Sequence, residues 1–145
     1  MEISIRGKTE CLTKTEIRKI FDFLCKYFLG KRLSKYIFIE VEFKSLNTVF
    51  GLCEPTDYDY KNHREFSIQI KKNMTRIKTI KTIIHEMVHV RQYARNHLKQ
   101  ISIDKYKWMG KNMIMQDLDY HKMPWEIEAC SYEKPVYQEC KQLLE

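Results

Sequence analysis

Long apolar runs, paired cysteines, glycine and proline are all scarce in this chain of 145 residues. No apolar stretch approaches the roughly 20 residues that a membrane-spanning helix needs, and the first ten residues lack the apolar core of a secretory signal. The 4 glycines and 3 prolines are too few for a collagen-like or low-complexity chain. The 5 cysteines include no Cys-x-x-Cys pair, so neither a zinc ribbon nor a thioredoxin motif is predicted. We therefore expect reduced thiols in a cytoplasmic protein without a membrane partner.

What the chain does contain is typical of a folded domain. Hydrophobic residues make up 43% and charged residues 31%, which is a globular composition. Because one domain spans about 150 residues on average, a single domain over residues 1–145 is predicted. The formal net charge of +7 favours anionic partners such as nucleic acid, although a solvated basic surface is the simpler explanation of such an excess.

Two regions carry a helical hydrophobic period. Apolar residues recur at steps of three and four over residues 13–29, and Gly30 follows as an expected stop. The same period recurs over residues 75–97, with no glycine or proline inside it. The sequence therefore predicts two amphipathic helices in these places.

Strands are expected between and after these helices. Residues 36–43 are β-branched and aromatic, residues 48–53 offer a possible second strand, and residues 65–71 alternate apolar with polar side chains. Residues 55–64 have the composition of a loop, in which His63 is expected to face solvent. Residues 106–115 favour a strand or hairpin.

A third helix is expected near the C-terminus. Pro124 suits a first helical position, where its missing N–H leaves no hydrogen bond unmade. Pro135 predicts a kink or a break, so the two pieces would cover residues 125–134 and 136–144. The order of helices and strands along the chain predicts an α+β fold in one layered domain.

Residues 85–89 read His-Glu-Met-Val-His, an H-E-x-x-H motif within the helix expected over 75–97. Residues four apart lie on the same face of a helix, so His85 and His89 can reach one metal ion. Imidazole nitrogens suit Zn²⁺. Glu86, at the edge of that face, can accept a proton from a metal-bound water without being a ligand itself.

A catalytic zinc normally has three protein ligands, so a third must come from elsewhere in the chain. The longer H-E-x-x-H-x-x-G-x-x-H pattern fails, because Gln92 and Arg95 occupy its last two defined positions. Cys53 is a weak alternative, which more simply is a buried strand thiol. His121 is a fallback ligand.

The remaining option is a glutamate on the third helix, where Glu126 and Glu128 are both available. Two residues correspond to about 200° of helical rotation, so only one of these carboxylates can face the metal. Ala129 lies on the face of Glu126, and its small side chain permits a close approach between helices. Glu126 is therefore the predicted third ligand.

H-E-x-x-H followed by Pro-Trp-Glu-x-Glu-Ala resembles the small zincin metallopeptidases of phages and prokaryotes, of the SprT-like or minimal gluzincin kind. The resemblance covers roughly residues 65–133. It implies a small, mostly antiparallel sheet packed on the active-site helix, with a glutamate helix downstream. It also implies hydrolysis of peptide bonds in a peptide or protein substrate, with Glu86 as general base and Zn²⁺ held by His85, His89 and Glu126. The strand over 65–71 would form the sheet edge that binds an extended substrate.

Two roles in such a site remain open. A donor to the tetrahedral oxyanion is needed, for which the candidates are Tyr106, Tyr120, His121 and Tyr132. Asp117 and Asp119 are candidates for orienting a ligand histidine, although such acids are more often surface groups or helix caps.

The competing hypothesis is a non-catalytic module that binds nucleic acid or protein through a basic surface. The basic residues that could form a phosphate-facing surface around the motif helix are Arg76, Lys78, Lys81, Arg91, Arg95 and Lys99. Glu86 discriminates between the two hypotheses, because a binding module has no need of a general base.

Overall fold

The structure is a computed structural model that describes residues 1–57, 61–115 and 119–145. Three α-helices within these residues are α1 (Lys14–Ser34), α2 (Arg76–Ala94) and α3 (Pro124–Leu143). They combine with seven strands and a short 3₁₀ helix (Tyr120–Lys122), so the predicted α+β class is confirmed. No helix of the described chain combines the length and apolar character needed to cross a membrane.

The larger sheet has four strands in the order β1 (Glu2–Arg6), β2 (Phe38–Lys44), β4 (Glu65–Lys71) and β3 (Gly51–Pro55). β1, β2 and β4 run parallel, whereas β3 runs antiparallel to β4. The expected mostly antiparallel sheet is therefore wrong: this sheet is mixed, because α1 crosses over between β1 and β2 and makes that pair parallel. The strand β1 is absent from the sequence prediction, since two isoleucines among polar neighbours give too short a pattern.

The position of β4 also corrects an expectation. β4 was expected at the sheet edge, but it pairs with β2 on one side and with β3 on the other. The edge next to the H-E-x-x-H helix is β3, which precedes β4 in the chain. Sequence order alone does not distinguish the two, because a hairpin places either of its strands outermost.

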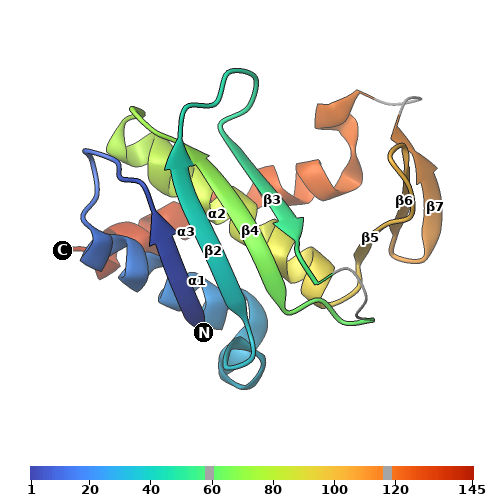
Figure 1. The fold of residues 1–145 in the computed structure, drawn as a ribbon, viewed down its shortest axis with the longest axis horizontal. Coiled ribbons are helices and arrows are strands. Elements are labelled where there is room, and N and C mark those ends of the chain that lie inside the picture. Colours follow the sequence, from blue (N-terminus) through green and yellow to red (C-terminus); the bar gives the residue numbers. More distant parts are fainter. Residues whose placement is uncertain (58–60, 116–118) are drawn as a thin grey trace.

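The three helices lie together behind the sheet (Figure 1). The sheet face toward them is apolar, with Ile39, Val41 and Ile68 fully buried. α2 packs against β3 and β4 of this sheet and against the other two helices, and most of its residues are buried, His89 and Glu86 included. A helix buried on several sides holds its side chains in fixed rotamers, so the motif sits on the most constrained element of the fold.

The ends of α1 and α2 follow local chemistry. Thr13 caps α1 and forms a capping box with Glu16. Gly30 does not end α1 as expected: it adopts a φ of 81°, which kinks the helix, and helical structure resumes to Ser34. α2 ends at Ala94, three residues before the predicted end, and Asn96 just beyond it has a φ of 61°.

α3 continues through Pro135 as one helix, so of the predicted kink or break the break is wrong. Proline removes the hydrogen bond to the carbonyl four residues earlier, here that of Ser131. Both Pro135 and Ser131 are exposed, so water can satisfy that carbonyl. On the opposite face Ala129 and Val136 are buried, and this packing holds both halves of the helix against the core.

A second sheet of three antiparallel strands comprises β5 (Leu98–Gln100), β6 (Lys105–Trp108) and β7 (Lys111–Ile114). It lies to one side of the main sheet, beyond the end of β3 (Figure 1). β6 and β7 form the predicted hairpin, whose turn places Met109 and Gly110 at φ values of 49° and 82°. This sheet connects α2 to the segment that leads into α3.

Candidate metal centre

The side chains of His85, His89 and Glu126 converge between α2 and α3. The Nε2 atom of His85 lies 3.2 Å from Oε1 of Glu126, and Nε2 of His89 lies 2.8 Å from Oε2 of the same carboxylate. One potential ligand atom of each residue lies within 4.8 Å of the other two. Two imidazole nitrogens and a carboxylate oxygen form a donor set that suits a catalytic zinc with one open position. The residues present therefore fit such an ion.

This cluster is buried and strongly coupled. Glu126 is 3% exposed and His89 is 6% exposed. Burial alone would raise the pKa of Glu126, but hydrogen bonds from His85 and His89 hold that pKa well below its usual range. Burial alone would lower the pKa of His89, but its hydrogen bond to Glu126 and the charge of Glu86 raise it to about 9. At neutral pH the Glu126 carboxylate is thus ionised, and His89 is in its positively charged imidazolium form.

The raised pKa of His89 predicts that metal binding is coupled to pH. Below pH 9 the imidazole holds a proton that a metal ion must replace, so Zn²⁺ binding at pH 7.5 should release about one proton. Affinity should then rise about tenfold per pH unit between 6.5 and 9. Calorimetric titration in buffers of different ionisation enthalpy measures the proton count directly. A zinc affinity that is flat over this range would contradict the protonated state of His89.

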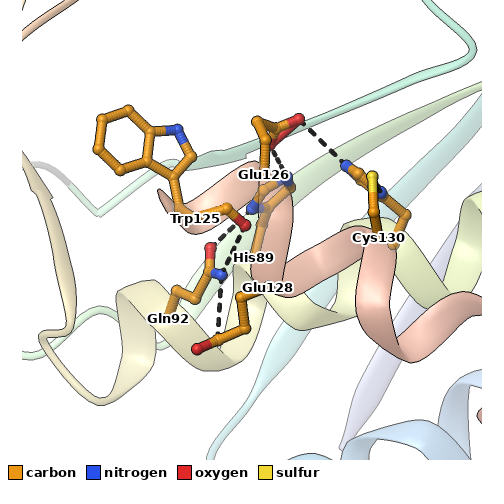
Figure 2. Close-up of polar contacts among 7 residues, drawn as sticks. His89, Gln92, Trp125, Glu126, Glu128 and Cys130 are labelled. Carbon is orange, nitrogen blue, oxygen red and sulfur yellow. Dashed lines mark hydrogen bonds and ion pairs between the residues drawn. The ribbon is translucent and has the colours of Figure 1, made fainter. Parts of the chain in front are cut away.

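Gln92 orients His89 from one turn further along α2. Its Oε1 accepts a hydrogen bond of 2.7 Å from Nδ1 of His89, and its Nε2 donates to the Trp125 carbonyl and to Glu128 (Figure 2). Because Nδ1 keeps its proton in the hydrogen bond to Gln92, it is Nε2, the nitrogen facing the ligand cluster, that loses its proton and offers a lone pair when His89 becomes neutral. Gln92 is fully buried, so this amide both fixes the imidazole and ties α2 to α3. The sequence did not indicate this role, because Gln92 was noted there only for occupying the glycine position of the longer H-E-x-x-H-x-x-G-x-x-H pattern.

Replacing Gln92 by leucine should therefore weaken zinc binding without removing a ligand. Loss of an outer partner of a ligand histidine typically costs about 10- to 100-fold in metal affinity. The change also leaves the carbonyl of Trp125 without its donor, so the unfolding temperature should fall. Chelator competition measures the affinity, with Gln138→Leu on the exposed side of α3 as the matched control. Wild-type zinc affinity in Gln92→Leu would show that the amide has no orienting role.

Comparison of this chain with models of protein families, with curated proteins and with solved structures finds no match in any of the three.

Glu86 lies beside the two histidines and is 4% exposed. Burial raises the pKa of its carboxyl to about 7, against the opposing charges of His89 and His85. A carboxyl with a pKa near neutrality can take up and release a proton during one reaction cycle. This is the property required of the predicted general base.

Glu86, Glu126 and Tyr120 lie between two cavities. A larger cavity of about 590 Å³ extends toward Phe50 and the middle of α3, and a smaller one of about 150 Å³ extends toward β5 and Tyr106. Both cavities are lined in part by β3, from Gly51 in the larger to Glu54 in the smaller. The cleft therefore follows the edge strand of the sheet past the metal cluster on both sides.

Gly51 marks the closest approach of β3 to Glu86. A methyl group at this position would lie 2.7 Å from Oε1 of Glu86 and 2.8 Å from Cγ2 of Thr82. Both distances are shorter than side-chain contacts allow, so the carboxylate would have to move. The edge strand passes this close because the residue there has no side chain.

Gly51→Ala should consequently impair any chemistry of Glu86 while leaving the fold and the ligand cluster intact. A displacement of about 1 Å at a catalytic group can cost on the order of 100-fold in rate. We expect a loss of that order in kcat/KM with unchanged zinc content, and a lower unfolding temperature because the added methyl also meets the buried Thr82 side chain. Full activity in this variant would show that Glu86 need not occupy the observed position.

Two of the four oxyanion-donor candidates line the large cavity together with His85 and Glu86, namely Tyr120 and His121. Tyr106 lines the smaller cavity and packs against Trp125 at a ring distance of 5.1 Å. Tyr132 accepts a hydrogen bond from Arg91 at 2.9 Å and lines neither cavity. Tyr132 is therefore set aside, and Tyr120 and His121, which share a cavity with His85 and Glu86, are the favoured candidates.

The alternative ligands stand apart from the cluster. Cys53 is a buried thiol of β3, and neither Cys53 nor His121 belongs to a potential ligand group among the described residues. Glu128 points to Gln92 at 3.2 Å rather than to the histidines. Asp119 is exposed and pairs with Lys122 at 3.5 Å, and no contact with a histidine is found for it among the described residues; Asp117 lies outside the described residues.

The position of His63 differs from the one predicted from the sequence. Its side chain is 18% exposed rather than solvent-facing, and its Nδ1 lies 3.0 Å from Oδ1 of the buried Asp57. The same aspartate accepts hydrogen bonds from the backbone of Arg64 and Glu65 at the start of β4. This pair therefore secures the loop rather than contributing to the cluster.

Two residues on the cavity side of α3 were not singled out in the sequence. Cys130 Sγ lies 4.0 Å from Nδ1 of His85, and Glu133 joins these two as a second group of potential ligands. Both follow Glu126 at helical spacings, four and seven residues on, which place them on its face. That spacing is the signal by which the sequence could have indicated them.

The basic residues expected to form a surface around α2 mostly contact groups of the chain itself. Five of the six have such partners, and Lys99 on β5 is the sixth. Arg76 pairs with Glu16. Lys78 lies over the Phe50 ring and Lys81 over the Tyr137 ring. Arg91 donates a hydrogen bond to Tyr132, and Arg95 donates one to the Leu29 carbonyl.

Proposed function

We propose that this protein is a zinc-dependent metallopeptidase of the zincin type. The observation that carries the proposal is the convergence of His85, His89 and Glu126, with Glu86 beside them at the wall of a cleft. Three ligands from two packed helices, an adjacent carboxyl and an open side together form the arrangement of a hydrolytic metal site. The resemblance of the H-E-x-x-H and Trp-Glu-x-Glu-Ala segments to small zincins supports the same function.

His85 and His89 would hold the ion through their imidazole nitrogens, and Glu126 through its carboxylate. When bound, zinc acts as a Lewis acid that polarises a carbonyl and makes a water molecule acidic near neutral pH. Glu86 takes the proton from the attacking water and passes it to the leaving amine, a cycle that suits a carboxyl with a pKa of about 7. Tyr120 or His121 donates to the oxyanion from the cavity side.

The edge strand β3 provides a place for the substrate backbone. Its free edge faces the cleft and passes the cluster at Gly51, where the strand comes closest to Glu86. An extended peptide that pairs with this edge would bring one of its carbonyl groups past the ligand cluster. The peptide or protein substrate would thus be recognised mainly through its backbone, with side chains entering the two cavities.

The test combines metal content with cleavage. Protein purified without added metal should contain about one zinc per chain, the number expected of one three-ligand site, and should cleave casein or a quenched peptide library. Chelation should remove the activity, and added Zn²⁺ should restore it. His85→Ala and His89→Ala should lose both zinc and cleavage, whereas His121→Ala, in the same cavity, should keep its zinc. Unchanged zinc content in the first two variants would end the proposal.

A further inference from the structure

The outer face of the β5–β7 sheet carries three lysines, Lys99, Lys105 and Lys107, which we call the lysine face. The register places Lys99 directly opposite Lys107 on neighbouring strands. Lys105 lies two residues from Lys107 on the same strand, so it points to the same side of the sheet. All three are exposed, whereas Tyr106 and Trp108, between and after them, pack partly against the core.

This arrangement is unfavourable in the free protein. Side chains directly opposite each other in an antiparallel pair have Cβ atoms about 5 Å apart, and like charges there destabilise the sheet. No salt bridge links these lysines to an acidic side chain within residues 1–57, 61–115 and 119–145. The third strand places uncharged Asn112 opposite Lys107 and Ile114 opposite Lys105, so it offers no counter-charge either. An external anion would relieve the repulsion.

We propose that the lysine face binds the phosphate backbone of nucleic acid. Three lysines whose Cβ atoms lie about 5 to 8 Å apart on one face of a sheet can contact several phosphates at once, and lysine binds phosphate as a compact point charge. The net charge of +7 adds a long-range attraction for a polyanion. This interaction surface is separate from the metal cluster and does not depend on the proposed peptidase activity.

Exposed isoleucines beside the lysines favour nucleic acid over an acidic protein segment. Ile101 and Ile103 are 58% and 88% exposed, in the segment that follows the strand carrying Lys99. A highly exposed branched side chain next to phosphate-binding lysines can enter a groove and contact sugars and base steps. The three strands that form the lysine face contain no acidic residue. A protein partner with charges of both signs would need such residues to fix its position on this face.

The test uses a triple variant and a control with the same change in charge. Lys99→Gln, Lys105→Gln and Lys107→Gln are combined in one protein, and Lys19→Gln, Lys31→Gln and Lys141→Gln, at exposed sites on α1 and α3, in the other. The probes are a labelled 20-nucleotide single strand, a 20-base-pair duplex and polyglutamate of matched charge. Binding is followed by anisotropy across a salt series, and circular dichroism and zinc content check that both variants are folded.

We expect wild-type protein to bind one or both nucleic-acid probes, the comparison showing which form is preferred. Each lost phosphate contact lowers the slope of log affinity against log salt by about 1, so the lysine-face variant should lose about 2 to 3 in slope. Its affinity at low salt should fall more than about tenfold, with the control within about twofold of wild type. Ile103→Ala should weaken binding without changing the salt slope, because it removes no charge.

Three outcomes would overturn the proposal. One is an absence of wild-type binding to both nucleic-acid probes at low salt. A second is an equal loss of affinity in the two triple variants, which would show that net charge alone is responsible. The third is binding of polyglutamate as tight as that of the nucleic acids, which would assign the lysine face to an acidic protein partner.

Discussion

Replacement of Glu86 by glutamine is expected to abolish hydrolysis while keeping both the zinc and the fold. Glutamine has almost the same shape but cannot take up a proton at neutral pH, and loss of a general base typically costs about 100- to 10,000-fold in rate. The amide is neutral, so it avoids the cost of burying a charge, which is the effect that raises the pKa of the Glu86 carboxyl. The unfolding temperature should therefore stay equal or rise. Steady-state cleavage of a quenched peptide, with zinc content measured in parallel, separates these effects.

Glu133→Gln provides the matched control for this variant. Glu133 lines the same cavity from α3, so its replacement removes the same charge from the same cavity as the replacement of Glu86 does. We expect the control to keep most of its activity. Equal rates for Glu86→Gln and wild type would mean that another group accepts the proton, and equal losses in both variants would point to the charge of the cavity rather than to a base.

Removal of Glu126 is expected to have the largest effect on metal binding outside the motif itself. Its carboxylate faces both histidines, so Glu126→Ala deletes one of three potential ligands. The loss of zinc affinity should exceed the roughly 10- to 100-fold that is typical of outer partners. Competition with a chelator of known affinity measures it.

The neighbouring Glu128 supplies the internal comparison. Glu128→Ala removes a contact to Gln92 at 3.2 Å and should weaken zinc binding by no more than about tenfold, the lower end for an outer partner. His121→Ala should leave the affinity unchanged. A severe loss in Glu128→Ala combined with none in Glu126→Ala would show that α3 presents its other face to the metal.

The sequence predicted the elements whose hydrophobic pattern is long and regular. The strand over 65–71 has the predicted bounds, and both long amphipathic helices exist with ends displaced by a few residues. The choice between Glu126 and Glu128 could be argued in advance, because helical rotation separates their faces and Ala129 marks the side that packs. The geometry agrees with that argument, since Ala129 is fully buried and Glu126 faces the histidines.

Features that depend on contacts distant in sequence were not predictable in the same way. The edge position of β3 follows from strand order, which local patterns do not encode. The continuity of α3 through Pro135 depends on packing of both of its halves against the core, which overrides the local preference for a break. The orienting role of Gln92 requires the Trp125 carbonyl and Glu128, more than 30 residues away, as its partners.

The position of the β5–β7 sheet between the two ligand helices has a consequence for the unfolded chain. His85 and Glu126 are separated by 41 residues, and that interval contains the whole small sheet. An ion held by both residues would act as a cross-link that closes this interval into a ring. A closed ring of that size has fewer conformations when unfolded than an open chain, a difference that grows with the logarithm of its length. Part of any stabilisation by metal would thus arise from restricting the unfolded chain, and it would be greatest in the segment that carries the lysine face.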